Sequence, residues 1–542
     1  MLFFYSRGYP KALVTLLQAN SYNMHAFWRQ FWTSRSLSAA VKELQPTQTP
    51  TFVKLVNFLT IGICAEIIAA AVCIFAWWQH DFAGGLAFGL ALLIGYPVVW
   101  AHMLALPVWL SYILRPKRTG KRILCRILEK QVAELRHKHK ITIVAIVGAV
   151  GKTSTKVAVA KTLGVSKRVI WEAGNYNDRL TVPLVLFGHK LPGLFNVWAW
   201  LKIWQRNKQI IASDYPYDVA VLELGTDGPG QIAEFAYLKP DIVVVTAIAP
   251  EHMEYFGTLD AVAAEELGAL AFAKKALVNI DDTPAEYLKH RKFTGYGLRK
   301  TADYFADHRT EHGVSGQTLT FHLGKTHSFS AKVPTLGTQG AKMAVAGAAV
   351  AHMLGEDNEH IEQGVTNIEA FAGRMRLFAG QKETTIVDDT YNASPIAVKA
   401  ALDVLYATKA PQRIAILGTM NELGGYTAQA HREVGEYCDP KKLDLVITIG
   451  PDAAEYLAPA AKQNGCTVVR CRSPYSAAAE AQEHLKKGAL ILAKGSQNGV
   501  FAEEAVKLLL ADPNDAVKLV RQSAYWLKKK AAQFNDLPSN AE

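Results

Sequence analysis

Residues 141–156, ITIVAIVGAVGKTSTK, place a glycine-rich turn directly after a run of aliphatic and β-branched residues. The run has the composition of a buried strand, and the residues after the turn suit a helix. In such a strand–turn–helix unit, the backbone N–H groups of Gly148–Lys152 surround phosphate oxygens at the helix N-terminus. Lys152 supplies positive charge to the β- and γ-phosphates, and the Thr153 hydroxyl can ligate Mg2+. The segment predicts a nucleotide-binding loop rather than an ordinary tight turn, although its G-x-x-G-K-T spacing is shorter than that of common P-loop NTPases.

Short apolar runs recur through the rest of the chain. Most lead into helical sequence, and they span 218–225, 241–248, 275–281, 384–389, 413–418, 443–450 and 489–496. This alternation is typical of parallel α/β sheets, which bind ligands at the carboxyl ends of their strands. Residues 300–335 include a stretch of alternating polar and apolar side chains and predict an antiparallel hairpin insertion. The fold class is therefore α/β, and we place two domains at 141–378 and 379–542.

Two side chains at predicted strand ends complement the loop. Glu223 ends the run DVAVLELG, where a carboxylate beside a phosphate loop is placed to hold Mg2+, directly or through water. His252 follows the next run, in the segment TAIAPEHMEYFG. A lone Glu is more often a helix cap or a surface residue, and a lone His is more often structural. Their shared position at strand ends is what favours a metal site.

The composition narrows the class of protein. The chain has 542 residues, of which 50% are hydrophobic, and 59 Lys and Arg against 48 Asp and Glu give a net charge of +11. This length fits several domains of ~100–200 residues, and so much apolar sequence excludes a disordered chain. The 6 cysteines include no CxxC pair and no zinc-ligand spacing. They indicate reduced thiols of a cytosol-facing protein rather than a disulfide scaffold.

The most apolar sequence lies before the loop, between two basic stretches. Residues 55–78 contain one charge, Glu66, and are long enough to cross a hydrocarbon core, which takes ~20 residues. Residues 82–114 contain no acidic residue, Lys or Arg, although Pro97 and Pro107 should kink them. A membrane hairpin explains these runs better than buried core helices, which are rarely apolar on all faces. A cleaved signal peptide would begin nearer the N-terminus.

The basic flanks set the predicted topology. Basic residues outnumber acidic ones in 1–54, and 115–122 reads RPKRTGKR, so the positive-inside rule puts both ends of the hairpin in the cytoplasm. We expect a multi-pass protein of the bacterial inner (cytoplasmic) membrane, with membrane lipids and no nucleic acid as partners. The expected segments are an amphipathic membrane-surface region at 1–50 (or a small soluble subdomain), a two-helix transmembrane hairpin at 51–115 and a basic linker helix at 116–140.

Several runs, in register along the chain, resemble the Mur ligases, the ATP-dependent amide-forming enzymes of peptidoglycan precursor synthesis. They include GAVGKTSTK, GNYNDRLTVPLVL, GRMRLF, VDDTYNASPIAVKAALDVL, LGTMNELG, HREVG and AKGSQNG. The similarity is closest to the members that add D-alanyl-D-alanine, and it covers roughly 141–510. It implies a P-loop central domain followed by a Rossmann-like C-terminal domain. The α-helical transmembrane hairpin stands where the family has a domain that holds the UDP-sugar end of its substrate.

The resemblance implies a two-step ligation with ATP and Mg2+. A substrate carboxylate attacks the γ-phosphate to form an acyl phosphate, and the amine of an amino acid or dipeptide, most simply D-Ala-D-Ala, then displaces phosphate. By the same resemblance, the nucleotide would be held by Gly148, Gly151, Lys152, Thr153, Ser154, Asn279, Arg374 and Asp389. Metal ions would be held by Thr153, Glu223 and His252. The acceptor and amine would be contacted by Asn175, Asn177 and Asn392.

The chain departs from the family's pattern at several positions. The Lys that the family carbamylates to bridge metal ions falls on Glu266, next to Glu265, in an ungapped register. Glu266 is anionic like a carbamylated Lys but shorter, and we expect it to be a catalytic residue and metal ligand, through a bridging water if needed. The catalytic set is then Lys152, Glu223, His252, Glu266 and Arg374. The other departures are Ala247, Asp178, Thr181 and Thr419.

Three functions fit these observations. The leading one is a membrane-anchored ligase that acts on a peptidoglycan precursor. The second keeps the chemistry and changes the acceptor to a poly-γ-glutamate type polymer or a lipid-linked precursor, which the missing UDP-binding domain favours. The third is a catalytically weak ATP-binding membrane scaffold, supported only by Glu266 and Ala247.

Overall fold

The computed structural model describes residues 8–19, 50–78, 83–93, 95, 116–324 and 327–534. The chain divides into two compact units, Met1–Leu124 and Cys125–Glu542. The boundary falls inside helix α6, Pro116–His139.

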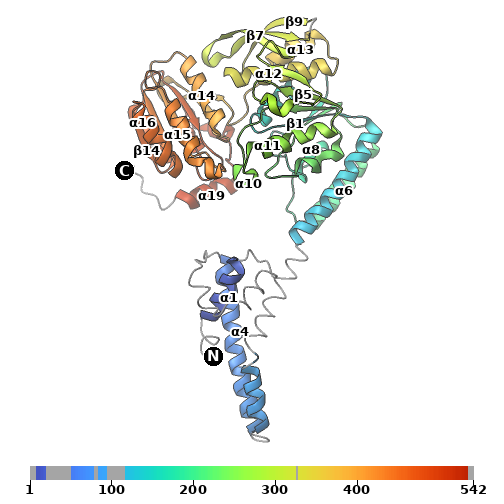
Figure 1. Ribbon diagram of the computed structural model, residues 1–542, viewed down its shortest axis with the longest axis vertical. Helices are drawn as coiled ribbons and strands as arrows, with labels where there is room; N and C mark the ends of the chain where they lie inside the picture. The colour runs from blue at the N-terminus through green and yellow to red at the C-terminus, as the bar shows by residue number, and fades with distance from the viewer. Residues whose placement is uncertain are drawn as a thin grey trace. The chain divides into compact units, whose positions relative to one another are not determined.

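The first unit is built around one long apolar helix. Helix α4, Pro50–Trp78, packs against α1, Gly8–Ala19 (Figure 1). Its segment Val56–Trp77 is long and apolar enough to cross a membrane, by length and composition alone. A shorter apolar helix, Ala83–Leu93, folds back on α4, and the rings of Trp77 and Phe88 meet edge to face with centroids 5.4 Å apart. The rest of the predicted second span lies outside the described residues, as does most of the predicted 1–50 region.

The second unit begins with a nine-stranded sheet in the order β2-β3-β1-β4-β5-β6-β7-β8-β9. Its strands are β1 Thr142–Val147, β2 Val169–Ile170, β3 Val219–Glu223, β4 Ile242–Val245, β5 Lys275–Asn279, β6 Thr294–Gly297, β7 Tyr304–Glu311, β8 Gln317–Leu323 and β9 His327–Val333. The strands from β2 to β7 pair in parallel, and β7, β8 and β9 pair antiparallel. The predicted hairpin insertion is therefore a three-stranded meander that extends the main sheet.

Helices cover both faces of this sheet because its central strands are apolar on both sides. One face packs against α7 Lys152–Leu163 and α12 Gly337–Met353, with α13 Asn358–Thr366 beside them. The other face packs against α8 Thr181–Leu186, α11 Leu259–Glu266 and η2 Ile232–Leu238. Val132 and Leu135 of α6 belong to this second layer. The predicted linker helix is thus docked on the sheet through its C-terminal half.

The C-terminal sheet has six strands in the order β10-β11-β15-β12-β13-β14. They are β10 Arg376–Gly380, β11 Thr384–Asp389, β12 Arg413–Gly418, β13 Leu445–Ile449, β14 Val468–Cys471 and β15 Leu490–Lys494. Only β10 runs antiparallel, at one edge. One face carries α17 Pro474–His484 and α18 Glu503–Leu509, and the other carries α14 Pro395–Ala407, α15 Thr427–Tyr437 and α16 Ala458–Gln463. Figure 1 shows the two sheets in green to yellow and in orange to red.

Candidate active site

The predicted phosphate loop lies at the carboxyl end of β1, and its two glycines hold backbone angles that favour glycine. Gly148 has φ of 121° and Gly151 has φ of 87°. A Cβ on Gly148 would lie 2.4 Å from Thr246 Oγ1, so the close approach to β4 also requires glycine. Lys152 is the first residue of α7, so its ammonium group lies beside the helix N-terminus.

Lys152 is surrounded by carboxylates. Its Nζ donates to the carbonyl oxygen of Gly148 and lies 3.1 Å from Glu251 Oε2. Burial by itself would lower the pKa of the ammonium, but Glu251, Glu266 and Glu223 together raise that pKa above its ordinary value. Lys152 therefore stays charged at neutral pH, as a group that binds phosphate must.

Glu223 ends β3 in a buried network that keeps it ionised. Its Oε2 lies 3.1 Å from Lys156 Nζ, and its Oε1 accepts from Asn177 Nδ2 at 3.4 Å. The Thr153 hydroxyl also hydrogen-bonds this carboxylate. Burial would raise the pKa of Glu223, but Lys156 and Lys152 lower it below its ordinary value. The structure thus brings together Thr153, Asn177 and Glu223, which are far apart in the sequence.

His252 connects the two sheets. It precedes the short helix α10, Met253–Phe256, with φ of 50°, and its Nδ1 lies 2.8 Å from Glu422 Oε2 in the C-terminal sheet domain. Its Nε2 lies 3.7 Å from Asp227 Oδ1. Burial lowers the pKa of the imidazole, but Glu422 and Glu251 together outweigh burial, and the pKa is raised.

Glu266 and Glu265 are both buried, and they accept hydrogen bonds from different parts of the backbone. Glu266 is 2% exposed, and its Oε2 accepts from the backbone N–H of Gly148 at 2.7 Å. Glu265 accepts from the backbone N–H groups of Gly230 at 2.7 Å and Ile232 at 2.6 Å. Burial raises the pKa of Glu266 to about 7, partly opposed by Lys152. Glu266 thus contacts the phosphate loop itself, whereas Glu265 holds the turn before η2.

An inner cavity lies on one side of the loop. Its lining includes Gly151, Ser154, Asn279, Tyr296, Lys342, Phe371, Arg374, Asp389 and Lys494. Because the lining comes from both sheet domains, a ligand there would be held by both.

An outer cleft lies on the other side of the loop. Its lining includes Gly151, Lys152, Thr153, Asn175, Asn177, Leu191, Glu223, His252, Arg374 and Asn392. Gly151 and Arg374 border both spaces. All of the predicted site residues border one space or the other, except Gly148, which begins the loop, and Glu266, which hydrogen-bonds Gly148.

Two predicted nucleotide residues are already engaged with neighbouring side chains. Asp389 Oδ2 lies 2.5 Å from Lys494 Nζ, and burial lowers the pKa of Lys494 although Asp389 opposes the change. Asn279 donates through Nδ2 to Thr246 O at 2.8 Å and to Asp282 Oδ2 at 2.9 Å. Asn279 therefore orders the loop after β5 and presents little free hydrogen-bonding capacity to the cavity.

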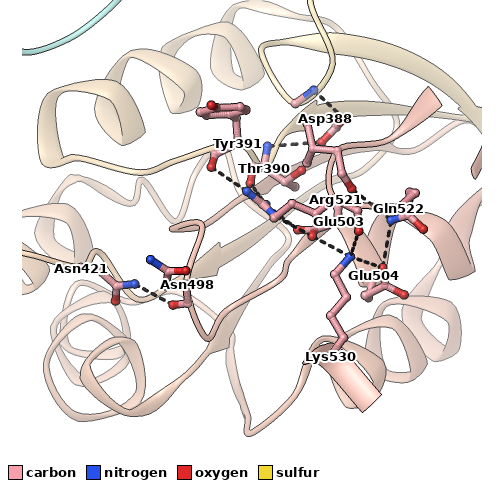
Figure 2. Close-up of polar contacts among 12 residues, drawn as sticks. Asp388, Thr390, Tyr391, Asn421, Asn498, Glu503, Glu504, Arg521, Gln522 and Lys530 are labelled. Atoms are coloured by element: carbon pink, nitrogen blue, oxygen red, sulfur yellow. Dashed lines mark hydrogen bonds and ion pairs between the residues drawn. The ribbon is translucent and has the colours of Figure 1, made fainter. Parts of the chain in front are cut away.

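A buried charge network braces the loop that carries Asn392 (Figure 2). Arg521 donates through Nε to Glu503 at 2.7 Å and through Nη1 to the carbonyl oxygen of Tyr391 at 3.0 Å, and it also bonds that of Thr390. Lys530, in α19 Ala524–Phe534, lies 2.9 Å from Glu503 and 2.6 Å from Glu504. The segment 519–534 therefore fixes the loop 390–394 through hydrogen bonds to its backbone. We call this segment the C-terminal strap.

Sequence reasoning missed four charged residues of this site: Glu251, Glu422, Lys494 and Arg521. Glu251 directly precedes His252 at a strand end, which is a usable signal. Glu422 and Lys494 lie in the quoted runs LGTMNELG and AKGSQNG. Arg521 lies beyond every quoted run, and its role depends on tertiary contacts that no local pattern encodes.

Comparisons with known proteins agree with this architecture. The Mur ligase middle domain matches residues 207–351, and the Mur ligase glutamate ligase domain matches residues 373–497. A UDP-N-acetylmuramoyl-tripeptide–D-alanyl-D-alanine ligase from Synechocystis is 28% identical over 382 residues, which cover 70% of this chain and 76% of the relative. The protein of the same name from Bacillus subtilis is 27% identical over 383 residues, covering 68% and 76%.

Solved structures with the same fold include MurF from Acinetobacter baumannii, with a TM-score of 0.59 and 22% identity over 70% of this chain and 79% of that chain. MurF from Thermotoga maritima, in complex with ADP, has a TM-score of 0.57 and 23% identity over 71% and 83%. These likenesses confirm the predicted α/β fold of the two sheet domains. The transmembrane hairpin stays a prediction.

Proposed function

We propose that this chain, which belongs to the Mur ligase family, joins D-alanyl-D-alanine to the carboxylate of a peptidoglycan precursor. It is an ATP-dependent, ADP-forming amide ligase, as its two family domains and its relatives indicate. The observation that carries the proposal is the position of the phosphate loop, where the inner cavity meets the outer cleft. A nucleotide in the cavity would direct its γ-phosphate past Lys152 into the cleft.

The proposed reaction has two steps. A carboxylate oxygen of the acceptor attacks the γ-phosphorus of ATP, the bond from phosphorus to the ADP oxygen breaks, and an acyl phosphate forms. The amine nitrogen then attacks the carbonyl carbon, inorganic phosphate leaves with the C–O bonding pair, and the nitrogen loses a proton. Lys152 and Arg374 would supply positive charge to the transferred group. Arg374 can do so because it borders both the cavity and the cleft, between which the group passes. Asn175, Asn177 and Asn392 line the cleft where acceptor and amine would meet.

The donor set beside the loop fits Mg2+. Thr153 and Glu223 offer a hydroxyl and an ionised carboxylate at the cleft, and Glu251 adds a second carboxylate there. Such hard oxygen donors are the ones that Mg2+ prefers, and His252 is the nitrogen donor nearby. When bound, Mg2+ would neutralise phosphate charge. Glu266 contacts the loop rather than the cleft, so its proposed role depends on an intervening water or on steering Gly148.

The membrane hairpin is part of the proposal. Helix α4 has the length and composition of a span, and Ala83–Leu93 would begin the second. Gly85 and Gly89 lie against Trp77 and Ile74 so closely that a Cβ would clash, as small residues do where membrane helices meet. We place the protein in the inner membrane of a bacterium, with both sheet domains in the cytoplasm.

The test is ligation by the detergent-purified chain with ATP, D-Ala-D-Ala and UDP-N-acetylmuramoyl-tripeptide, with ADP and amide product both measured. Lys152→Ala should lower kcat/KM by about 10²–10³-fold, since one preorganised charge at a transferring group contributes that much. Lys300→Ala is the matched control, because this Lys is exposed and pairs with Asp307 in the antiparallel meander. A Lys152→Ala protein that ligates like the parent would exclude the loop as the phosphate site.

A further inference from the structure

Helix α9, Val197–Ala212, and the segment before it carry apolar side chains that are exposed in the described part of the chain. Trp198 is 77% exposed, Phe195 is 64% exposed and Val197 is 63% exposed. Leu191, Leu201 and Trp204 are also exposed. The helix is already anchored by its opposite side, where Trp200, Ile203 and Asn207 are buried. The exposed apolar face is therefore additional to what folding requires.

Basic side chains surround this face. Lys190, Lys202, Arg206 and Lys208 are exposed, and no Asp or Glu occurs between His189 and Ser213. Lys208 Nζ lies 4.1 Å from the centre of the Trp204 ring, so charge and aromatic surface are interleaved. Exposed Trp and Phe beside Lys and Arg, in a segment that contains no acidic residue, match the interface of a bilayer that carries anionic headgroups.

The face continues to the rim of the outer cleft. Leu191 lines the cleft, and its backbone N–H donates to Tyr176 Oη at 2.9 Å. Tyr176 lies between Asn175 and Asn177, the residues predicted to contact the acceptor. The apolar face and the acceptor end of the cleft therefore share an edge.

We propose that the exposed face of residues 190–208, here called the α9 surface, rests on the headgroup interface of an anionic bilayer, so that the cleft receives acceptors carried by membrane lipids. The acceptor part rests on the proposed ligase function, whereas the bilayer contact does not. A lipid-linked acceptor would reach Asn175 and Asn177 without leaving the membrane surface.

The bilayer contact is tested with an environment-sensitive dye at position 198, introduced as Trp198→Cys in the full chain with Cys64→Ser and Cys73→Ser. The control is Val517→Cys, because Val517 is an apolar residue that is 81% exposed on the C-terminal sheet domain. Brominated phosphatidylglycerol vesicles should quench the dye at 198 and not at 517, and quenching should weaken with salt or phosphatidylcholine. Equal quenching at both positions, or none at 198, would overturn the proposal.

Other occupants give different results. A blue shift at 198 that grows with protein concentration and is insensitive to brominated lipid would assign the α9 surface to a second copy of the chain. A blue shift that depends on neither would assign it to another segment of the same chain. Either result overturns the bilayer contact.

The acceptor is tested with the double variant Trp198→Ser, Leu201→Ser. Its KM should rise about tenfold or more for the muramoyl tripeptide carried on a polyprenyl diphosphate, because two apolar contacts with lipid are lost. Its KM for the UDP-linked tripeptide should not change. Equal changes for both acceptors would indicate damage to the cleft and overturn the acceptor part. If the parent ligates neither acceptor, the proposed ligase function is wrong. The quenching of the dye at position 198 still decides whether the α9 surface contacts the bilayer.

Discussion

Lys152 and Glu266 both hydrogen-bond the backbone of Gly148. Lys152 donates to the carbonyl oxygen of Gly148, and Glu266 accepts from its N–H group. The carboxyl of Glu266 therefore orients the peptide that precedes the phosphate site through this hydrogen bond. Neutralising this carboxyl should disturb transfer of the phosphoryl group more than binding of the nucleotide, which the rest of the loop still holds.

We predict that Glu266→Gln lowers kcat about tenfold or more while the Kd for ATP changes little, since only one charge next to the loop is removed. Added bicarbonate should not change the activity of the parent, because a Glu needs no carbamylation. Glu265→Gln is the matched control. It should lower Tm and leave kcat near the parental value, since Glu265 accepts hydrogen bonds from the backbone of Gly230 and Ile232. Steady-state kinetics, ATP titration and thermal unfolding separate these outcomes. Parental kcat in Glu266→Gln would mean that this carboxyl has no part in catalysis.

Asp388 gives a prediction about pH. It accepts from Gly373 N at 3.1 Å and from Thr390 N at 3.2 Å, and burial raises its pKa from 3.8 to about 6. The folded state binds this proton more tightly than the unfolded state, so stability is lost as pH rises from about 4 to about 6. The loss is at most about 3 kcal/mol for a shift of this size.

Asp388→Asn cannot ionise, so its stability relative to the parent should improve between pH 4 and pH 7. Thermal unfolding at both values measures the change. The exposed carboxyl of Asp214 gives a control in Asp214→Asn, for which the difference from the parent should stay constant. A constant difference for Asp388→Asn as well would contradict the raised pKa.

At the scale of elements, the C-terminal strap explains how a loop without regular structure keeps Asn392 at the cleft. Arg521 bridges the carbonyl oxygens of Thr390 and Tyr391 to the buried carboxylate of Glu503. Removing one partner of a buried ion pair is strongly destabilising, whereas removing both can be nearly neutral. A double variant that removes both partners can therefore recover stability. Whether it also recovers kcat separates a stabilising role of Arg521 from a positioning role.

We predict that Arg521→Met lowers the free energy of unfolding by about 1.5–3 kcal/mol, because Glu503 loses its bidentate partner and keeps Lys530. The double variant Arg521→Met, Glu503→Leu should recover part of that stability. It should not recover kcat, because the carbonyl oxygens of Thr390 and Tyr391 still lack the hydrogen bonds from Arg521. Tyr525→Phe, at an exposed position in α19, is the control. A double variant with parental kcat would show that the strap only stabilises the fold.

The strands that sequence predicted are those with continuous apolar runs, such as β1, β4 and β12, because burial on both faces requires them. Strand β2 has two residues and β10 reads RLFAG, so neither carries a distinctive pattern. The antiparallel direction of β10 is defined by its pairing with β11, and the residues of β10 themselves do not encode that direction. At the site, Lys152, Thr153 and Glu223 could be predicted from strand ends. Glu422 acts across domains, and Arg521 acts through long-range contacts within the C-terminal sheet domain, so neither could be predicted.

At the scale of the whole molecule, the open question is the environment of α4. Cys64 is exposed and Cys73 is half-buried within Val56–Trp77, while Cys125, Cys438, Cys466 and Cys471 are buried in the second unit. A charged maleimide reacts with thiolates that water reaches, and hydrocarbon excludes both the reagent and the thiolate. The two cysteines of α4 therefore report directly on whether lipid surrounds this helix.

We predict that Cys64 and Cys73 stay unmodified when intact membranes holding the full chain are treated with a charged maleimide, and that both react after the membrane is dissolved in SDS. Val517→Cys provides the internal standard, because Val517 is 81% exposed in the second unit and its replacement should react to completion in inverted vesicles. In right-side-out vesicles the same position should be protected, since both basic flanks of the hairpin are expected inside. Peptide mass spectrometry reads every position in one experiment. If Cys64 reacts in intact membranes as fast as the thiol at position 517, α4 is a water-exposed helix and the predicted transmembrane hairpin is wrong.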